Sequence, residues 1–239
     1  MAAASVAMKG YAGYAATIAL VAVVYFAAAK VALALAIPPG YATAVWPPSG
    51  IAVAALLLSG SRLWPGVWLG AAAANFTIQL SLPVACAIAT GNTLEALLAT
   101  ALVQRTIGRH GRFERGEDVV RFVGIAVAAG AVAATAASLT LGLGGFVAWQ
   151  QTGYHWWTWW QGGVAGILIG GPPVLSWARP QRAGWTPDRG AELVMFAIAL
   201  LVAATASFAW PYGTSLPFFF LLLPFMVWAP FPFSPPLGS

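Results

Sequence analysis

Long apolar runs, separated by short polar segments, most constrain what this chain can fold into. A bilayer core takes about 20 apolar residues per helix, and eight runs in the sequence reach or approach that length. Because 60% of the 239 residues are hydrophobic and only 7% are charged, the chain lacks the polar surface that a water-soluble domain needs. We therefore expect an all-α integral membrane protein with about eight transmembrane helices, at 11–36, 44–60, 64–80, 83–104, 119–146, 156–178, 191–210 and 214–230.

Three parts of this pattern need separate interpretation. The first run contains Lys30 and lacks a cleavage site after a short apolar core, so it is expected to be a retained helix and not a signal peptide. The second opens with Trp46-Pro47-Pro48-Ser49-Gly50, which predicts a short helix or backbone that dips into the membrane beside it. Beyond the last run, prolines recur too closely for a helix. The expected organisation is a polytopic domain at 1–229 and a Pro-rich tail at 230–239.

The basic residues indicate the orientation. If the N-terminus is placed in the cytoplasm, the cytoplasmic segments hold ten of the 11 Lys and Arg residues, and the remaining one is Lys30. An excess of Lys and Arg in cytoplasmic loops is the usual pattern of multi-span proteins. This count predicts that both termini are cytoplasmic. The ten residues are Lys9, Arg62, Arg105, Arg109, Arg112, Arg115, Arg121, Arg179, Arg182 and Arg189.

The positive net charge of +5 and the pI near 9.8 do not point to nucleic acid, because the basic residues lie between apolar segments and form no single stripe. The segment 105–118 is the longest cytoplasmic connector. Its charges and glycines favour a solvated loop, and contact with anionic lipid headgroups is the functional alternative. Membrane lipids are therefore the expected partners of this part of the chain.

Polar residues inside the predicted spans are the candidates for function, because each needs a partner or a hydrated cavity in the membrane. Asn75 lies on the third span. Asn92 and Glu95 lie three residues apart on the fourth, so they share one face of that helix. A carboxyl group near the middle of a span is expected to be protonated, hydrogen-bonded or paired. A structural hydrogen bond between helices and a ligand or proton site are both open for Glu95.

Aromatic and small residues gather around the sixth span. Five tryptophans, Tyr154 and His155 lie between Trp149 and Trp160, which is typical of a belt at the membrane interface. A lid or aromatic pocket over an outward-facing cavity is the alternative. The glycines that follow predict close contact with another helix, and Pro172 and Pro173 are expected to break or kink the span.

Signatures of catalysis and of metal binding are missing from the sequence. It contains no Gly-rich phosphate loop, paired carboxylates, HExxH motif or nucleophile elbow. Cys86 is the single cysteine, which excludes an intrachain disulfide or a Cys-based metal cluster. We expect no catalytic residues, no metal site and no cofactor.

Short motifs follow one another in a fixed order along the chain. The first block is Trp46-Pro47-Pro48-Ser49-Gly50-Ile51-Ala52, followed by Gly60-Ser61-Arg62-Leu63-Trp64-Pro65-Gly66, Gly70 and Asn75. This series resembles the type-one MASE (membrane-associated sensor) domain over residues 11 to 228, and Gly91-Asn92-Thr93-Leu94-Glu95-Ala96 resembles the next block of that family. Trp159-Trp160-Gln161-Gly162-Gly163, with Gly166 and Pro172, is similar to its later Trp-Trp-x-Gly-Asp motif.

The resemblance implies an eight-helix input domain of bacterial inner-membrane signalling proteins, which usually precedes a histidine kinase or diguanylate cyclase module. Two departures stand out. Gly163 occupies the position where the family commonly has Asp, and a Pro-rich tail follows Ala229 in place of an output module. We therefore expect a stand-alone sensor module in the inner membrane that relays its signal to a partner protein.

Three functions remain open on these observations. The favoured one is a sensor whose small-molecule ligand binds among the second, third, fourth and sixth spans. A small-solute transporter or channel is the second, because broken helices and a buried carboxyl group fit that class. A non-catalytic subunit of a larger membrane complex is the third. The predicted ligand-binding residues are Trp46, Pro47, Asn75, Asn92, Glu95 and Trp160.

Overall fold

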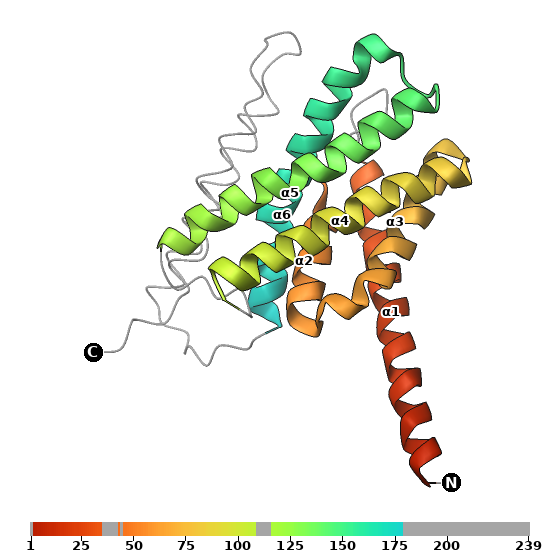
Figure 1. Ribbon diagram of the computed structural model, residues 1–239, viewed down its shortest axis with the longest axis vertical. Coiled ribbons are helices and arrows are strands. Elements are labelled where there is room, and N and C mark those ends of the chain that lie inside the picture. Colours follow the sequence, from red (N-terminus) through yellow and green to blue (C-terminus); the bar gives the residue numbers. More distant parts are fainter. Residues whose placement is uncertain (1, 35–42, 44, 109–115, 179–239) are drawn as a thin grey trace. The chain divides into compact units, whose positions relative to one another are not determined.

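The computed structural model describes residues 2–34, 43, 45–108 and 116–178. Within these ranges the regular structure is entirely helical (Figure 1): α1 (Ala2–Ala34), α2 (Pro47–Ser59), η1 (Ser61–Leu63), α3 (Trp64–Gln79), α4 (Leu82–Thr106), α5 (Gly116–Leu143), η2 (Trp149–Gln151) and α6 (Thr152–Trp177). The predicted helical fold class is confirmed, and the first six apolar runs coincide with α1 to α6. The expected spans at 191–210 and 214–230 and the tail at 230–239 lie outside the described residues.

Helix boundaries follow local sequence rules. Proline occupies the first turn of α2, α3 and α4, where its missing N–H leaves no hydrogen bond unmade. Gly60 ends α2 with a φ of 96°, a conformation that favours glycine. Of the two expectations for Pro172 and Pro173, a break is wrong: α6 continues through both prolines to Trp177.

Three helices are long and apolar enough to cross a membrane among the described residues: α1 from Gly13, α4 and α5. The predicted short second helix is confirmed, because α2 has 13 residues and a rise of 1.5 Å per residue gives about 20 Å, against a hydrocarbon core of about 30 Å. Only 17% of the span in α1 is buried, against 56% in α4. The first helix is therefore peripheral, and the fourth is central.

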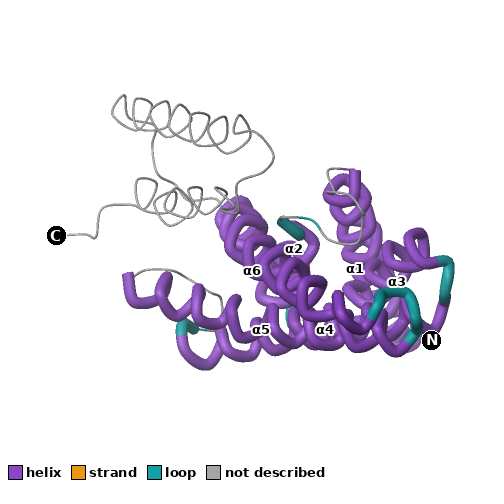
Figure 2. The backbone as a smooth tube through the Cα atoms, turned by 90° about the horizontal axis from the view of Figure 1, so that it is seen from above, coloured by secondary structure: helices purple, strands orange, loops and turns teal. Residues whose placement is uncertain are grey.

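Glycines allow the helices to approach one another closely. On Gly70 of α3, a Cβ atom would lie 2.6 Å from the carbonyl oxygen of Ala22 in α1. On Gly91 of α4, it would lie 2.4 Å from the Cβ atom of Ala136 in α5, and these two helices run side by side in both views (Figures 1 and 2). In lipid, helix association depends on such packing, because lipid tails are as apolar as the side chains.

The tightest approach joins α2 to α6. A Cβ atom on Gly50 would lie 2.3 Å from the carbonyl oxygen of Gly166 and 2.5 Å from the backbone nitrogen of Gly171. On Gly166 it would meet the carbonyl oxygen of Trp46. The predicted close contact through the glycine face of the sixth span is confirmed, and its partner is the short helix α2.

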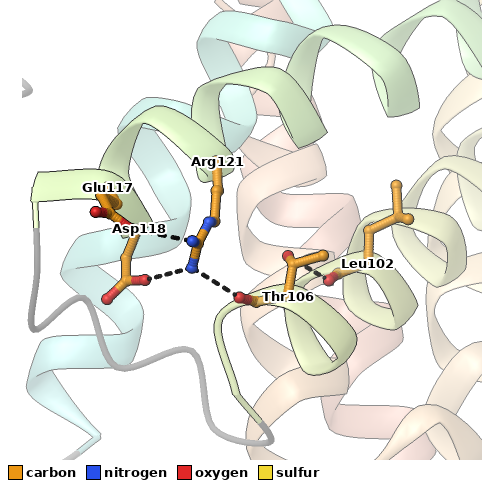
Figure 3. A network of polar contacts seen from close by, with 5 residues as sticks. All are labelled: Leu102, Thr106, Glu117, Asp118 and Arg121. Carbon is orange, nitrogen blue, oxygen red and sulfur yellow. Dashed lines mark hydrogen bonds and ion pairs between the residues drawn. The ribbon is translucent and has the colours of Figure 1, made fainter.

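One ionic network joins the end of α4 to the start of α5 (Figure 3). The Arg121 guanidinium lies 3.0 Å from Glu117 Oε2 and 3.5 Å from Asp118 Oδ1, and it donates a 3.2 Å hydrogen bond to the Thr106 carbonyl oxygen. Acidic groups in the first turn of a helix and a cation at a helix C-terminus both interact favourably with the helix dipole. The network links α4 to α5 on the side where the sequence predicts cytoplasm.

Candidate functional site

The centre of the candidate site is Glu95, a carboxyl group buried between three helices. Its side chain extends from α4 and is 1% exposed. The Ser49 hydroxyl, from the first turn of α2, donates a 2.8 Å hydrogen bond to Glu95 Oε2. Ser49 is itself 2% exposed, so this polar contact between α2 and α4 is fully enclosed. The hydrogen bond between helices that the sequence left open for Glu95 is present.

The second carboxyl oxygen of Glu95 points toward α6 at a position that carries no side chain. A Cβ atom on Gly163 would lie 2.7 Å from Glu95 Oε1, and the same point is 3.9 Å from the Gly130 Cα atom of α5. Glu95 Oε1 is buried and has no hydrogen-bond partner among the described residues. The backbone of α6 at Gly163 therefore faces this oxygen and supplies no donor to it.

Asn92 adds a second set of buried polar atoms one turn before Glu95. The residue is 2% exposed, and both Nδ2 and Oδ1 lack hydrogen-bond partners within the described ranges. The Tyr25 hydroxyl of α1 interacts with the Asn92 side chain, but the contact does not reach the distance and angle of a full hydrogen bond. Buried polar atoms are nearly always hydrogen-bonded in folded proteins, and leaving one unsatisfied costs about 1–3 kcal/mol. An amide with neither end satisfied is therefore a strong candidate for ligand contact.

Trp46 connects this polar cluster to the rest of the site. Its indole nitrogen donates a 3.4 Å hydrogen bond to the Tyr25 hydroxyl, and Tyr25 also interacts electrostatically with Glu95. Its backbone N–H donates a 2.9 Å hydrogen bond to the carbonyl oxygen of Gly162 in α6. The residue before α2 is thus held on both sides, by α1 through its ring and by α6 through its backbone.

A small cavity of about 20 Å³ lies on the other side of Trp46. This volume admits about one water molecule. Asn75 contributes a polar side chain to the wall; its Nδ2 donates a 2.9 Å hydrogen bond to the Ala71 carbonyl oxygen. The remaining wall is mainly apolar. The lining residues are Leu33, Thr43, Trp46, Asn75, Ile78, Trp159 and Gly162.

The structure brings most of the predicted site residues together. Asn92 and Glu95 form the polar cluster, Asn75 and Trp46 line the cavity, and Tyr25 links Trp46 to the cluster. Pro47 is the first residue of α2, and its carbonyl oxygen lies 3.0 Å from where Gly170 would carry a Cβ atom.

Trp160 lies elsewhere. Its indole nitrogen donates a 2.9 Å hydrogen bond to the Val127 carbonyl oxygen of α5, and its ring stacks on Trp156 at 6.0 Å.

Three residues that the sequence did not single out belong to the site: Tyr25, Ser49 and Trp159. Tyr25 is 1% exposed although it lies in the most peripheral helix. Ser49 lies inside the Trp-Pro-Pro-Ser-Gly block. The signal available in the sequence was therefore a hydroxyl group at a helix start, where it can face a buried acid. Trp159 lines the cavity with Gly162, whereas Trp160 faces α5. No group of three or more His, Cys, Asp or Glu residues that could hold a metal occurs in the described ranges.

Comparison with known proteins gives one family. The family model of MASE1 matches residues 17–239, nearly the whole chain. Neither the curated proteins nor the solved structures contain a match. The blocks that carry the resemblance include the residues of the buried cluster, Ser49, Asn92 and Glu95. The chain belongs to the MASE1 family of membrane-associated sensor domains.

Proposed function

We propose that this protein is a non-catalytic sensor module that binds a small polar ligand beside Trp46 and relays binding to a partner protein. One observation carries the proposal: Asn92 and Glu95 Oε1 are buried without hydrogen-bond partners among the described residues, and Tyr25 links them to Trp46, which lines a cavity. A ligand with both donor and acceptor groups would satisfy the Asn92 amide. Membership of the MASE1 family supports the sensor role.

The topology that we propose has eight spans, with both termini in the cytoplasm and the domain in the bacterial inner membrane. Six helices in the described part coincide with expected spans, and three of them meet the length and composition of a span. The cytoplasmic assignment rests on the distribution of Lys and Arg. In this topology the cavity lies toward the outer side, because Lys30 and the end of α1 lie on that side.

The relay that we propose is a change in the packing of α2 against α6. The cavity holds about 20 Å³, whereas ligand pockets for drug-sized molecules are usually about 300–1,000 Å³. A metabolite could therefore bind only if Trp46 and α2 shift. Because the backbone N–H of Trp46 is hydrogen-bonded to the carbonyl oxygen of Gly162, such a shift would be transmitted to α6. Ligand binding would then favour one of two helix arrangements.

The buried carboxyl group also fits a small-solute transporter, in which an acid inside the membrane couples flux to an ion. A flux measurement on liposomes separates the two functions. Solute uptake that disappears in Glu95→Gln would favour transport, whereas ligand binding without uptake would favour sensing. A stable partner that co-purifies while ligand binding is absent would instead favour a subunit of a larger complex.

Asn92→Leu tests the ligand site. Leucine cannot hydrogen-bond, so we expect ligand affinity to fall at least tenfold, while stability stays equal or rises because an unsatisfied amide is removed. The measurement is thermal unfolding of the purified protein in nanodiscs. It is repeated with a panel of candidate ligands that contains amino acids, nucleosides and sugar phosphates. A ligand at 100 times its Kd stabilises the wild type by about 2.7 kcal/mol.

The matched control is Leu94→Ala, at a position 50% exposed on the same helix, which should keep the ligand shift. Loss of stability in Asn92→Leu without any effect on ligand affinity would show that Asn92 has a structural role. A panel in which no compound shifts the unfolding of the wild type would argue against the sensor proposal.

A further inference from the structure

We infer that Glu95 is a proton-binding site inside the membrane: its carboxyl group carries a proton on Oε1 while α2, α4 and α6 are packed as in this structure. This inference goes beyond the proposed function, because a proton can occupy Glu95 whether or not a larger ligand binds beside Trp46. It rests on three observations, which are the enclosure of the side chain, the charges around it and the donors that its oxygens receive.

Glu95 is 1% exposed, and α2 and α6 meet it through Ser49 and Gly163. Its Oε1 atom is itself buried from solvent, and the cavity of about 20 Å³ is lined by Trp46 and not by Glu95. A proton is the cation that fits at this oxygen without moving a helix. A buried carboxyl group without compensation favours its neutral form.

No ion pair with Glu95 occurs among the described residues, so none of the described contacts compensates a charge there. The titratable group that faces it is Tyr25 of α1, whose neutral hydroxyl cannot balance a negative charge. The helices α2 and α3 contain no Asp, Glu, His, Lys, Arg, Tyr or Cys. Arg105, the basic residue on the same helix, is ten residues away, or about 15 Å at 1.5 Å per residue.

The other charged or titratable groups on the surrounding helices lie toward helix ends. Lys30 of α1 hydrogen-bonds Thr77 Oγ1 of α3 at 3.4 Å. Arg121 is bound to Glu117 and Asp118 in the first turns of α5, nine or more residues before Gly130. In α6, Tyr154 and His155 precede Gly163 by eight or nine residues, about 12 Å or more along the helix. Cys86 is nine residues before Glu95 on α4. None of these described groups pairs with Glu95.

The hydrogen bonds around Glu95 favour the neutral acid over the carboxylate, because an unpaired buried O–H group costs less free energy than an unpaired buried charge. Ser49 donates one hydrogen bond to Oε2, which acts as the acceptor oxygen, and Oε1 receives none from the described residues. A buried carboxylate requires donors to both oxygens. Loss of the proton would break the O–H bond at Oε1, pass the proton to water and leave a carboxylate. That charge would need water or a new donor beside Gly163, so deprotonation must loosen the contact between α4 and α6.

Infrared spectroscopy of the full chain in nanodiscs tests the inference without any added ligand. The wild type should show the carbonyl stretch of a protonated carboxyl group near neutral pH, and Glu95→Gln should lack it. Glu117→Gln is the matched control, because Glu117 is exposed and bound to Arg121, so its removal should leave the band unchanged. A wild-type spectrum without this band, or a band that survives Glu95→Gln, would overturn the inference.

Ser49→Ala keeps the test decisive if Glu95→Gln does not fold. Removal of the donor to Oε2 should shift the band to higher frequency, because a carbonyl that accepts no hydrogen bond is stiffer. An unshifted band in a folded Ser49→Ala protein would show that the band belongs to another carboxyl group. A positive result together with an inactive ligand panel would leave the proton site standing and remove only the sensor ligand.

Discussion

At the residue scale, the candidate site concentrates polar atoms whose burial is not offset by hydrogen bonds. Glu95 has one bonded oxygen, and the Asn92 amide has no bond at either end in the described part of the protein. Each unsatisfied buried group costs about 1–3 kcal/mol. Two apolar residues at these positions would pack without that cost, so the arrangement is explained more readily by binding than by stability.

Ser49→Ala measures how much the hydrogen bond to Glu95 contributes. We expect the free energy of unfolding to fall by about 1–3 kcal/mol, because both oxygens of a buried carboxyl group would then lack partners. Thermal unfolding in nanodiscs measures the change. Thr106→Ala is the control: its hydroxyl bonds the Leu102 carbonyl oxygen at an exposed helix end (Figure 3), so we expect a change within about 0.5 kcal/mol. Equal effects in the two variants would contradict this assignment.

At the element scale, α2 is the helix whose position is most closely determined. It is too short to span the bilayer, yet eight of its 13 residues are buried. Its backbone meets α6 at Gly50, its Ser49 hydroxyl bonds α4, and the residue before it bonds α6. The same contact explains why α6 continues past Pro172 and Pro173: packing of its glycine face on α2 holds a helix that local propensity would end.

Gly50→Ala tests this contact. The new Cβ atom would lie 2.3 Å from a backbone oxygen and 2.5 Å from a backbone nitrogen of α6, so the helices must separate. Overpacking of this kind costs about 1–3 kcal/mol, and we expect a lower unfolding temperature and weaker ligand binding.

Gly124→Ala of α5 is the matched control, since no neighbouring atom lies within 4 Å of its Cβ position. It should be neutral or stabilising, because Ala favours helix over Gly by about 1 kcal/mol. A Gly50→Ala protein as stable as Gly124→Ala would show that α2 and α6 do not pack this closely.

At the scale of the whole molecule, the proposed topology can be tested without a ligand. In a Cys86→Ser background, cysteines introduced at Arg109 and Arg182 should react with an impermeant reagent only from the cytoplasmic side. A cysteine at Gln150, in the exposed segment before α6, should react only from the outer side. Labelling of positions 109 and 182 from opposite sides of the membrane would contradict the topology, which places an even number of spans between the N-terminus and each position.

Much of the fold could be predicted from sequence because bilayer energetics act on composition and length. The six described helices begin and end within a few residues of the apolar runs, apart from α1, which begins at Ala2 instead of 11. Early residues of α1 contain few helix-breaking side chains, so the helix extends beyond the apolar run.

For the site, Asn92 and Glu95 were identifiable because polar residues are scarce in the spans. Ser49 and Tyr25 carry no such signal in the sequence, because their role depends on the residues that they contact.

Local composition and ordered motifs were sufficient to identify this protein as a helical membrane protein of the membrane-associated sensor domains. Which side chains meet depends instead on the packing of the helices. Trp159 and Trp160 are adjacent, yet successive residues of a helix point about 100° apart, so one lines the cavity and the other bonds α5. Contacts such as that of Ser49 with Glu95, 46 residues apart, depend on how whole helices pack, and no local pattern encodes that.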